Sequence, residues 1–499
     1  MRARPGMAVV PGSGTLSRMY RWFAGAALAA TFCAAAVAVP RLHAAQAAQP
    51  PRGIVNTFTQ VCANCHGPNG SGGSAPSLLD DTWAHGGSDA EIAASIKNGW
   101  PGTPMPPFGG TLSDQDIRAM VIYIRELRDH AASGLLPRTA PPLPTDVVKS
   151  ELHAFRIETV VDGLDNPWEA VVLPDGALLV PERIGRLRIF RNGVAGPPIT
   201  GLPTIWVRQD GGLMDVTIHP DYAKNGWIYL AFSEPGGSAQ GASTTRVIRG
   251  KIKDGALVEQ QTLFQAPQDL FWADNTHFGC RFFWDKGKHL YYSIGDRGHL
   301  DTAQDLKSPY GKIHRINDDG TVPKDNPFVD TPGAVTTIWS YGHRNPQGLD
   351  VDPKTGAMWE SEHGPRGGDE LNVIEKGKNY GWPIATFGMN YDGTPMTPTT
   401  VTEAPGMVGP KLHWTPSIAV SGIGFYRGDK FPKWKGNLFA AGLAGQQLAR
   451  LEVTGNTITH QETLLRGFGR IRQVVNAPDG TLYVVFAMPG KIVRLVPAS

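Results

Sequence analysis

The chain has 499 residues, and its 47 basic side chains nearly balance 45 acidic ones, giving a formal net charge of +2. This balance excludes a nucleic-acid-binding tail and a polybasic membrane-binding protein, because both need charge of one dominant sign. Hydrophobic residues make up 41% and charged residues 18%, which is enough to bury a core and too apolar for disorder. The 60 glycines and 41 prolines indicate a turn-rich, mainly β protein, and the length favours two folded units.

The amino terminus has the pattern of an export signal over residues 1–47. Two arginines precede an Ala-rich apolar run, residues 23–39, and small residues near Ala44 and Ala47 offer cleavage sites. The run is also just long enough for an uncleaved membrane anchor, which is the alternative. We expect cleavage, and therefore a periplasmic protein without a stable membrane span.

A haem-attachment motif stands at Cys62-Ala-Asn-Cys65-His66. Two thiols at this spacing can add to the two vinyl groups of one haem, and the adjacent imidazole then reaches the iron. A bare cysteine pair could instead be redox-active or bind zinc, but the following histidine and the export signal argue against both. We therefore expect haem c, attached through Cys62 and Cys65, with His66 as an iron ligand.

The second iron ligand is expected to be a methionine. Met105 stands in a stiff, proline-rich loop, which suits holding a thioether at the iron. Met120 is the alternative, but it belongs to a helical stripe with Ile117, Val121 and Ile124 and is more typical of a core residue. Met105 is therefore the predicted ligand.

The haem motif lies in residues 51–131, which resemble a small class I cytochrome c. Ligation by His and Met implies electron transfer rather than oxygen binding. A proline-rich segment, residues 132–151, follows and predicts an extended, semi-rigid linker. A haem carrier makes no product alone, so we expect the remaining chain to perform chemistry.

From residue 152 to 499 the pattern changes to short β-rich runs around turns. An apolar strand, a polar turn ending in glycine and a second strand recur six times. The glycines are Gly176, Gly226, Gly287, Gly356, Gly436 and Gly480. Blades of about 50 residues with four strands are typical of β-propellers, so the sequence predicts a six-bladed β-propeller preceded by a small all-α domain. A pair of β-sandwiches would leave the repeat unexplained, and a strand near residues 155–161 is expected to complete the last blade.

Polar, glycine-rich segments interrupt the apolar blades. Propellers place functional residues on loops at one end of the central channel. The segments that stand out are residues 277–281, 293–298, 341–348, 362–370 and 377–383.

Three motifs within these segments carry a family resemblance. They are Gly-His-Arg-Asn-Pro-Gln-Gly (342–348), Gly-Pro-Arg-Gly-Gly-Asp-Glu (364–370) and Asn-Tyr-Gly-Trp-Pro (379–383). On these motifs, residues 152–499 resemble the soluble glucose dehydrogenase and aldose sugar dehydrogenase family. The resemblance implies a propeller that uses pyrroloquinoline quinone (PQQ) and calcium to oxidise a sugar.

The resemblance also implies catalytic roles at matching positions. His277 matches the general base that takes the proton from the sugar C1 hydroxyl, and Asp296 matches the carboxylate that holds its imidazole. A neutral histidine is a base near physiological pH, and a carboxylate stabilises its protonated form. Arg344 matches the guanidinium near the reactive quinone carbonyl, where it stabilises developing negative charge. Asn345 and Gln347 match further residues around the quinone.

Two calcium sites follow from the same resemblance. Gly364 and Pro365 match backbone carbonyl ligands of a calcium ion at the cofactor, and calcium prefers such oxygen ligands. Asp369, Glu370 and Tyr380 match a separate structural calcium site, the tyrosine through its backbone oxygen. A solvated turn is the alternative for the two acidic residues.

A pair of arginines completes the predicted cofactor site. Arg470 and Arg472 alternate along a strand, so both are expected on one side of it, matching arginines that bind the cofactor carboxylates. A surface pair is the alternative. Three positions depart from the family pattern: Ala444 replaces a lysine, Asp210 a glutamine, and Cys280 a small residue beside the presumed base.

The leading hypothesis is a periplasmic quinohaemoprotein. It oxidises an aldose or similar hydroxyl compound with PQQ and passes electrons to haem c and on to a cytochrome or respiratory chain. One alternative is a calcium-dependent, lactonase-like hydrolase, which would act without quinone. The other is a non-enzymatic electron carrier on a binding propeller, which would neither bind quinone nor turn over.

Overall fold

The computed structural model describes residues 53–498 except 135, 138 and 275. The predicted signal, residues 1–47, lies outside the described residues. Residues Pro50–Ser499 form one compact unit, which contains both the helical and the β-rich parts of the chain. Among the described residues, no helix combines the length and the apolar character that a bilayer crossing requires.

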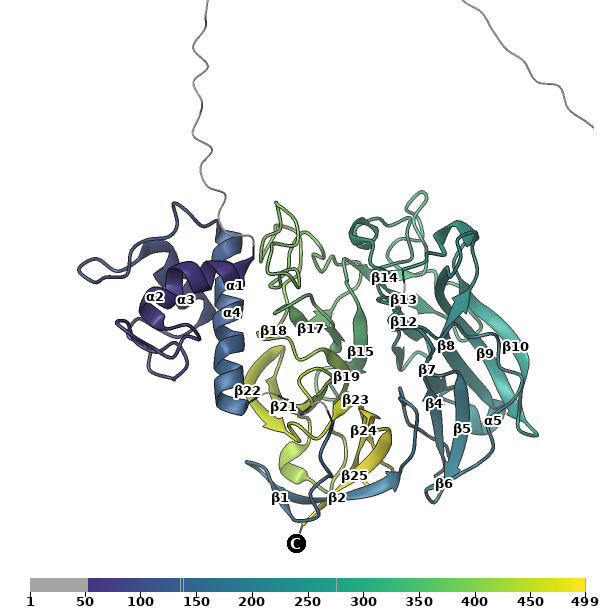
Figure 1. The fold of residues 1–499 in the computed structure, drawn as a ribbon. Coiled ribbons are helices and arrows are strands. Elements are labelled where there is room, and N and C mark those ends of the chain that lie inside the picture. Colours follow the sequence, from purple (N-terminus) through teal and green to yellow (C-terminus); the bar gives the residue numbers. More distant parts are fainter. Residues whose placement is uncertain (1–52, 135, 138, 275, 499) are drawn as a thin grey trace, which may run out of the picture. The chain divides into compact units, whose positions relative to one another are not determined.

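The first part of this unit is helical (Figure 1). Three short segments are followed by two longer helices. They are α1 Ile54–Thr57, the π-helix η1 Phe58–Cys62, α2 Ala63–His66, α3 Asp89–Asn98 and α4 Asp114–Ser133. Capping boxes start both longer helices, Ser88 with Glu91 and Ser113 with Asp116. The expected all-α domain is confirmed. Helix α4 continues two residues beyond residue 131, the expected end of that domain.

The helical part has its own hydrophobic core. Phe58, Ile92 and Ile124 are buried in it, and Met120 is only 1% exposed. Met105 is half-buried and packs against the same cluster. The helical stripe of Met120 is therefore a core stripe, as expected from its spacing.

The remainder is a six-bladed β-propeller, which confirms the predicted fold class (Figure 1). Five blades are four-stranded antiparallel sheets whose strands follow in chain order. Their strands are β3 Val171–Val172, β4 Leu178–Glu182, β5 Arg186–Arg191 and β6 Val194–Ala195; β7 Leu213–Ile218, β8 Trp227–Pro235, β9 Ser243–Lys253 and β10 Ala256–Gln265; β11 Phe282–Trp284, β12 Leu290–Ile294, β13 Lys312–Ile316 and β14 Ile338–Tyr341; β15 Pro346–Val351, β16 Met358–Glu362, β17 Asp369–Ile374 and β18 Leu412–Trp414; β19 Val420–Phe425, β20 Leu438–Gly442, β21 Gln447–Thr454 and β22 Thr457–Leu464. Short helices lie between strands: α5 Tyr222–Asn225, η2 Gln268–Leu270, η3 Leu300–Ala303 and η4 Pro432–Trp434.

The sixth blade closes the ring with strands from both ends of the propeller. It has five strands: β23 Arg470–Asn476, β24 Leu482–Met488, β25 Lys491–Pro497, β2 Ala154–Val161 and β1 Val148–Lys149. Strand β2 pairs antiparallel with β25, and Phe155 lies opposite Pro497. The predicted closing strand is therefore confirmed. Strand β1 falls inside the predicted linker, residues 132–151, so the end of that segment belongs to the blade.

The six repeated glycines all occupy the turn between the first and second strand of a blade. Five of them have φ between +70° and +83°. They are Gly176, Gly226, Gly356, Gly436 and Gly480. Only glycine adopts this left-handed region without a steric penalty, so the repeat in the sequence reflects a backbone requirement.

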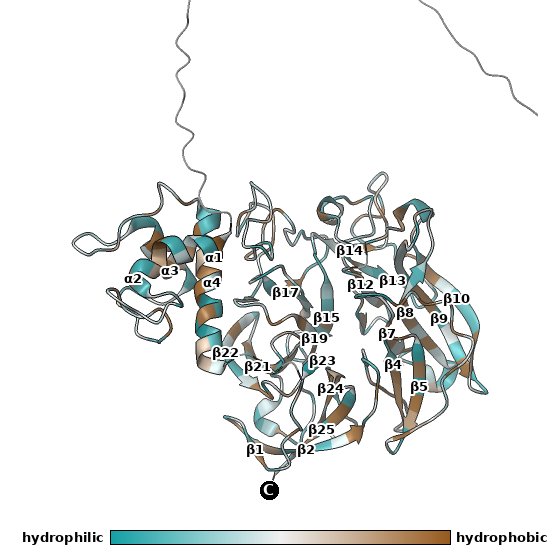
Figure 2. Ribbon diagram, in the orientation of Figure 1, coloured by the Kyte–Doolittle hydropathy of each residue, from teal (hydrophilic) through white to brown (hydrophobic). Residues whose placement is uncertain are grey.

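The blades are held together by apolar clusters between neighbours. Every one of the six interfaces has its own buried cluster, including the closing one, where Val485 and Ile492 pack with Leu178 and Phe190. Figure 2 shows brown, hydrophobic segments along the strands and also on helices α3 and α4. Burial of this kind is the main stabilising term, at roughly 25 cal/mol for each Å² of apolar surface.

Candidate active site and cofactor sites

The predicted site residues gather at one end of the ring. In each blade the first and second strands are antiparallel, so the start of one and the end of the other share an edge. His277, Arg344 and Arg470 stand at or before the starts of β11, β15 and β23, whereas Asp296 and Gly364 follow the ends of β12 and β16. Strand topology therefore collects residues that are far apart in the sequence.

His277 and Asp296 form a direct pair. The Nδ1 atom of His277 lies 2.6 Å from Oδ1 of Asp296. The backbone N–H of Gly298 donates to the same oxygen at 2.8 Å, and the indole Nε1–H of Trp382 donates to Oδ2 at 2.7 Å. With acceptors only at Asp296, Nδ1 carries the proton and Nε2 of His277 remains available as a base.

Electrostatics favours the same protonation states. Burial and then the charge of Arg344 lower the pKa of His277, although Asp296 opposes them. Burial by itself would raise the pKa of Asp296, but the hydrogen bond and charge of His277 outweigh it, and the pKa is lowered. At neutral pH the pair is thus a neutral imidazole beside a carboxylate.

Close backbone packing fixes this histidine. His277 has φ of +50°, a conformation that non-glycine residues rarely adopt. A Cβ at Gly295 would lie 2.2 Å from the carbonyl oxygen of His277, so only glycine fits opposite it. Such local strain is typical of functional sites.

Arg344 connects the pair to the turn between β16 and β17. Its Nη1 atom donates to the carbonyl oxygens of His363 and Gly364, each at 2.9 Å. The turn is tight, because a Cβ at Gly364 would lie 1.7 Å from the carbonyl oxygen of Gly368. Asp369 holds it from within, accepting the N–H of Gly364 at 3.1 Å and that of Val420 at 2.9 Å.

The two amide side chains join several segments. Asn345 Oδ1 accepts the N–H of Gly279 at 3.1 Å and a hydrogen of Gln347 Nε2 at 3.1 Å. Gln347 Oε1 in turn accepts from Nη1 of Arg472 at 3.0 Å. Both predicted amides therefore position the loop of the base and the guanidinium of Arg472.

Cationic side chains converge around His363. Burial lowers the pKa of His363 far below its ordinary value, and the charges of Arg472, Arg344 and Arg470 lower it further. Arg472 stacks on Trp168, with its guanidinium carbon 3.9 Å from the ring centre. The register of β23 shifts on either side of Ile471, so the strand is bulged between the two predicted arginines. Even so, both arginines act on the same histidine.

Buried donors without partners indicate what this cluster could bind. Among the described residues, the Nε atoms of Arg344 and Arg472 and Nε2 of His363 are buried and lack hydrogen-bond partners. Unpaired buried donors destabilise a protein, and several positive charges crowd the same place. A flat acceptor with several carboxylates would satisfy the donors and offset the charge, so these residues fit a quinone of the PQQ kind.

The carbonyls predicted to bind calcium at the cofactor are partly engaged. Gly364 accepts one hydrogen bond, from Arg344, whereas Pro365 accepts from the N–H of Gly368 at 2.9 Å and from Oγ of Ser417 at 3.0 Å. A carbonyl oxygen has two lone pairs. The Gly364 oxygen is therefore free to bind a cation, and Pro365 becomes free only when the Ser417 hydroxyl turns away.

A second charged site of opposite sign lies close by in sequence. Glu360, Glu362 and His343 are buried, and their ligand atoms lie within 4.8 Å of one another. Asn372 Nδ2 donates to these carboxylates at 3.1 and 3.3 Å, and to Glu370 at 3.4 Å. One amide cannot neutralise three carboxylates. Burial, and next the charge of Glu362, raise the pKa of Glu360 and of Glu370 far above the ordinary value.

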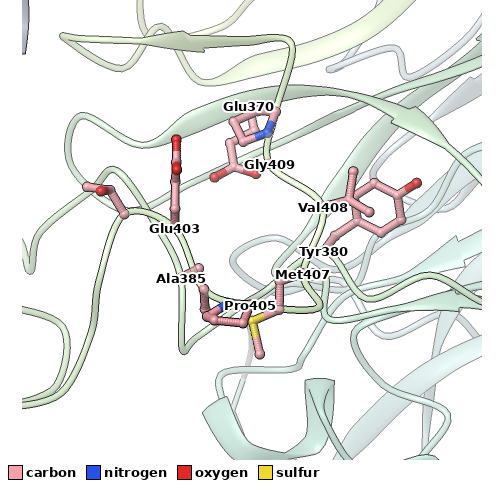
Figure 3. Close-up of a pocket in the computed structure, with 11 residues that line it drawn as sticks. Glu370, Tyr380, Ala385, Glu403, Pro405, Met407, Val408 and Gly409 are labelled. Atoms are coloured by element: carbon pink, nitrogen blue, oxygen red, sulfur yellow. The ribbon is translucent and has the colours of Figure 1, made fainter.

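A cavity of about 570 Å³ opens beside this acidic cluster (Figure 3). Glu370, Tyr380 and Glu403 are among its lining residues, whereas His277 and Arg344 are not. The predicted Glu370 and Tyr380 thus share one cavity. Asp369, the third predicted ligand, is committed to the backbone of the neighbouring turn. Oxygen donors without a compensating positive charge suit a hard divalent cation.

The haem motif occupies the end of η1 and α2. Cys62 is half-buried and Cys65 is exposed. His66 Nδ1 lies 3.0 Å from the carbonyl oxygen of Pro76, which leaves Nε2 for a metal. Trp100 donates its backbone N–H to the Met105 carbonyl at 3.1 Å, and its indole Nε1 is buried without a partner among the described residues. A haem carboxylate would satisfy that donor, so the residues fit haem c.

Of the three positions that depart from the family pattern, Asp210 and Cys280 lie near His277 in the propeller. Asp210 Oδ2 accepts the backbone N–H of His277 at 3.4 Å, so it stands beside the base. Cys280 is fully buried and packs with Phe278 in an interblade cluster, as a small apolar residue would. Ala444 follows the end of β20.

Sequence reasoning missed several contributors. Trp382 and His363 lie inside polar, glycine-rich segments that stand out in the sequence, residues 377–383 and 362–370, and those segments were the signal. A buried network of Arg281 with Glu169, at 2.5 Å, and Asp215, at 3.1 Å, had no such signal, because its members are scattered over three blades. Arg281 also donates to the carbonyl of Gln347 at 3.0 Å and so links this network to the site.

Fold and site together define an oxidoreductase built on a β-propeller with a cytochrome c domain. The model of the family described as Glucose / Sorbosone dehydrogenase matches residues 164–494, and the chain belongs to this family. The model described as Cytochrome C oxidase, cbb3-type, subunit III matches residues 49–124. The resemblances that the sequence motifs suggested are therefore confirmed.

Individual relatives agree with this assignment. The chain is 39% identical over 349 residues to the aldose sugar dehydrogenase YliI of Escherichia coli, covering 69% of this chain and 93% of that one. The PQQ-bound aldose sugar dehydrogenase structure from Streptomyces coelicolor aligns with a TM-score of 0.57 at 28% identity, covering 71% and 99%. The helical part is 40% identical over 73 residues to subunit FixP of a cbb3-type cytochrome c oxidase from Azorhizobium caulinodans, covering 14% and 25%.

Proposed function

We propose that this protein is a periplasmic quinohaemoprotein that oxidises an aldose, or a similar hydroxyl compound, and passes the electrons to its own haem c. The propeller belongs to a family of sugar dehydrogenases and the same chain carries a cytochrome c domain. The observation that carries the proposal is His277: a neutral imidazole with a free Nε2 in the midst of converging arginines.

The chain's own residues account for the proton. His277 Nε2 takes the proton of the C1 hydroxyl, and the imidazolium that forms is stabilised by the carboxylate of Asp296. Trp382 and Gly298 keep that carboxylate in place through their hydrogen bonds. When bound, PQQ supplies a two-electron acceptor for the hydride that leaves C1.

The arginines bind the cofactor and stabilise the negative charge that develops on it. Arg344 offers its guanidinium where negative charge develops, and Arg470 and Arg472 bind the carboxylates of the cofactor. Asn345 and Gln347 keep these groups in register. The carbonyls of Gly364 and Pro365 are the proposed ligands of a calcium ion at the cofactor, and Glu370 and Tyr380 bind a structural calcium ion in the cavity of Figure 3.

The helical domain, residues 51–131, is the proposed electron acceptor. Cys62 and Cys65 attach the haem, His66 and Met105 ligate its iron, and haem accepts one electron at a time. Export through the signal of residues 1–47 places the protein in the periplasm, where a further cytochrome or respiratory chain component takes the electrons.

Anaerobic mixing tests the proposal. Haem-loaded protein is combined with PQQ, calcium and a panel of aldoses, and the haem absorption band is followed. Reduction that requires both quinone and sugar, and that disappears in His277→Ala, is the expected result. The matched control is Cys280→Ser, a buried neighbour with no proposed chemical role.

Other outcomes would contradict the proposal. Hydrolysis of a lactone in the absence of quinone would establish a calcium-dependent hydrolase. Absence of both quinone binding and turnover would indicate a binding propeller with an electron carrier. Sugar-dependent reduction that persists in His277→Ala would remove this residue from its role.

A further inference from the structure

One face of helix α4 is devoted to contacts with the propeller. Gln115, Arg118, Ile122, Glu126 and Asp129 recur every three or four residues, the spacing of a single helix face. Each of these side chains contacts a propeller residue within the same compact unit. Because the opposite stripe, with Met120 and Ile124, fills the haem-domain core, α4 is shared between the two domains.

The centre of this face lies on the turn between β16 and β17. Arg366 Nε donates to Glu126 Oε1 at 2.7 Å, and its Nη2 pairs with the other carboxylate oxygen. The two side chains are only 19% and 18% exposed. Next to them, a Cβ at Gly367 would lie 2.7 Å from Cγ2 of Ile122, so the helix packs directly on the glycine backbone. A two-pronged, largely desolvated pair is far more restrictive than a surface ion pair.

Arg118 extends the contact to two segments beside this turn. Its Nε donates to the carbonyl of Phe387 at 3.0 Å, and its Nη2 donates to Thr415 Oγ1 at 3.0 Å. Thr415 in turn donates to the carbonyl of Gly367 at 3.1 Å. Asp89 of helix α3 balances the charge of Arg118 at 2.5 Å. The β16–β17 turn is therefore held from two directions by the haem domain.

Both ends of the face are anchored as well. Gln115 Nε2 donates to the carbonyls of Thr400, at 2.5 Å, and Thr397, at 3.2 Å. Asp129 accepts two hydrogen bonds from Nη2 of Arg466, both at 2.8 Å. Contacts at the start, middle and end of a five-turn helix face prevent it from pivoting about any one of them.

The same turn reaches the proposed active site. Arg366 stands two residues after Gly364, whose carbonyl oxygen accepts a hydrogen bond from Arg344. On the helix side, the stripe behind Glu126 packs in the core against which Met105 lies. Covalent and hydrogen bonds therefore lead from Arg344 through the turn to α4, and apolar packing continues from α4 to Met105.

We propose that the haem domain stays docked on the propeller through this face of α4, with Glu126 and Arg366 as positioning residues for intramolecular electron transfer. The inference rests on the proposed function. Each sugar oxidised at C1 releases two electrons and two protons, so the haem is reduced twice, and a one-electron oxidant such as a soluble cytochrome must reoxidise it each time. The haem domain does not need to move on its linker, because it already contacts the propeller.

A structural measurement tests the docking without any turnover. The variant Glu126→Lys/Asp129→Lys places two positive charges opposite Arg366 and Arg466. Soret circular dichroism follows melting of the haem domain, and tryptophan fluorescence, which comes mostly from the ten tryptophans of residues 152–499, follows the propeller. We expect the haem-domain transition to fall by about 5 °C or more, with the propeller transition unchanged.

A control variant isolates the contact from a general charge effect. Asp81→Lys changes a fully exposed carboxylate on the haem domain, whose ion pair with Arg128 is away from the α4 face. It should leave both transitions in place. Equal melting of the control, the double variant and the wild type would overturn the docking.

A kinetic measurement tests the positioning role. After rapid mixing with sugar, haem reduction should be first order, independent of protein concentration and insensitive to viscosity. In Glu126→Lys/Asp129→Lys it should slow by roughly tenfold or more, while sugar-dependent reduction of a small dye stays at the wild-type rate. Glu126→Gln, which keeps one hydrogen-bond acceptor, should retain an intermediate rate.

The outcomes separate this inference from the proposed function. If the wild type reduces neither the dye nor its haem with any sugar, the proposed function fails, while the melting comparison still decides the docking. If the wild type reduces its haem but the double variant does so equally fast, or if the wild-type rate falls with viscosity, the domain moves and the positioning role is wrong.

Discussion

Two buried sites of opposite charge are built from three pairs of adjacent residues, and each pair contributes one residue to each site. Arg344, His363 and Asp369 belong to the cationic end of the ring, whereas their neighbours His343, Glu362 and Glu370 belong to the acidic cluster. Successive residues of an extended backbone point to opposite sides, so one short motif can build two sites. A conspicuous motif therefore does not assign all its residues to a single ligand. One site fits an anionic quinone, and the other fits a divalent cation.

The largest effect is expected at the cationic end. His277→Ala removes the base, so kcat for sugar oxidation should fall by about 10²- to 10⁴-fold. Asp296→Asn should lower kcat as well, because the amide neither fixes the Nδ1–H tautomer nor stabilises the imidazolium. Steady-state kinetics with a dye acceptor provide the measurement. Wild-type kcat in His277→Ala would show that this end of the ring is not catalytic.

Cofactor affinity should change next. Arg472→Ala removes a buried guanidinium and should weaken PQQ binding by roughly 10- to 100-fold, as expected for charged hydrogen bonds. Arg472→Lys keeps the charge but loses the fork, so it should recover only part of the affinity. Fluorescence titration with PQQ measures both. Arg494→Ala, which breaks partly exposed ion pairs on β25, is the control and should bind PQQ normally.

The acidic site should respond to calcium rather than to quinone. Saturating calcium should raise the propeller melting temperature by about 5 °C, and Glu370→Gln should abolish most of this increase. Glu158→Gln, on the exposed face of β2, should respond to calcium as the wild type does. Differential scanning calorimetry with and without a chelator makes the comparison. A calcium effect that survives in Glu370→Gln would place the ion elsewhere.

The smallest expected effect is on the pH dependence of stability in the absence of calcium, which bound calcium should remove. Burial raises the pKa of Glu360 and Glu370, so the folded state binds more protons than the unfolded state above pH ~4.3. Without calcium, the contribution of these two groups to stability should therefore decrease as pH rises from that value towards the raised folded-state pKa. The slope is at most about 1.4 kcal/mol per pH unit for each group. Urea unfolding of chelated wild type and chelated Glu370→Gln at several pH values measures it as the difference between the two proteins. The same pH dependence in both would contradict the assignment.

Local chemistry made much of the molecule predictable. Cys62, Cys65 and His66 are adjacent because haem attachment requires them at one spacing, and no tertiary information is needed to recognise it. The turn glycines repeat because each blade needs a left-handed residue at the same place. Blade number, ring closure by β2 and the helical haem domain therefore followed from the sequence. The polar, glycine-rich segments likewise indicated that His277 and Arg344 would lie at one end of the ring.

Tertiary structure decided what each residue contacts. Asp369 has the residue type of a calcium ligand, yet its oxygens accept the backbone N–H groups of Gly364 and Val420. Glu126 has the appearance of an ordinary surface glutamate of a helix, but its partner is Arg366, 240 positions away. Sequence patterns report which face a side chain occupies, because backbone geometry is local. The group that meets that face depends on how distant segments pack, and only the folded ring and the docked helix specify it.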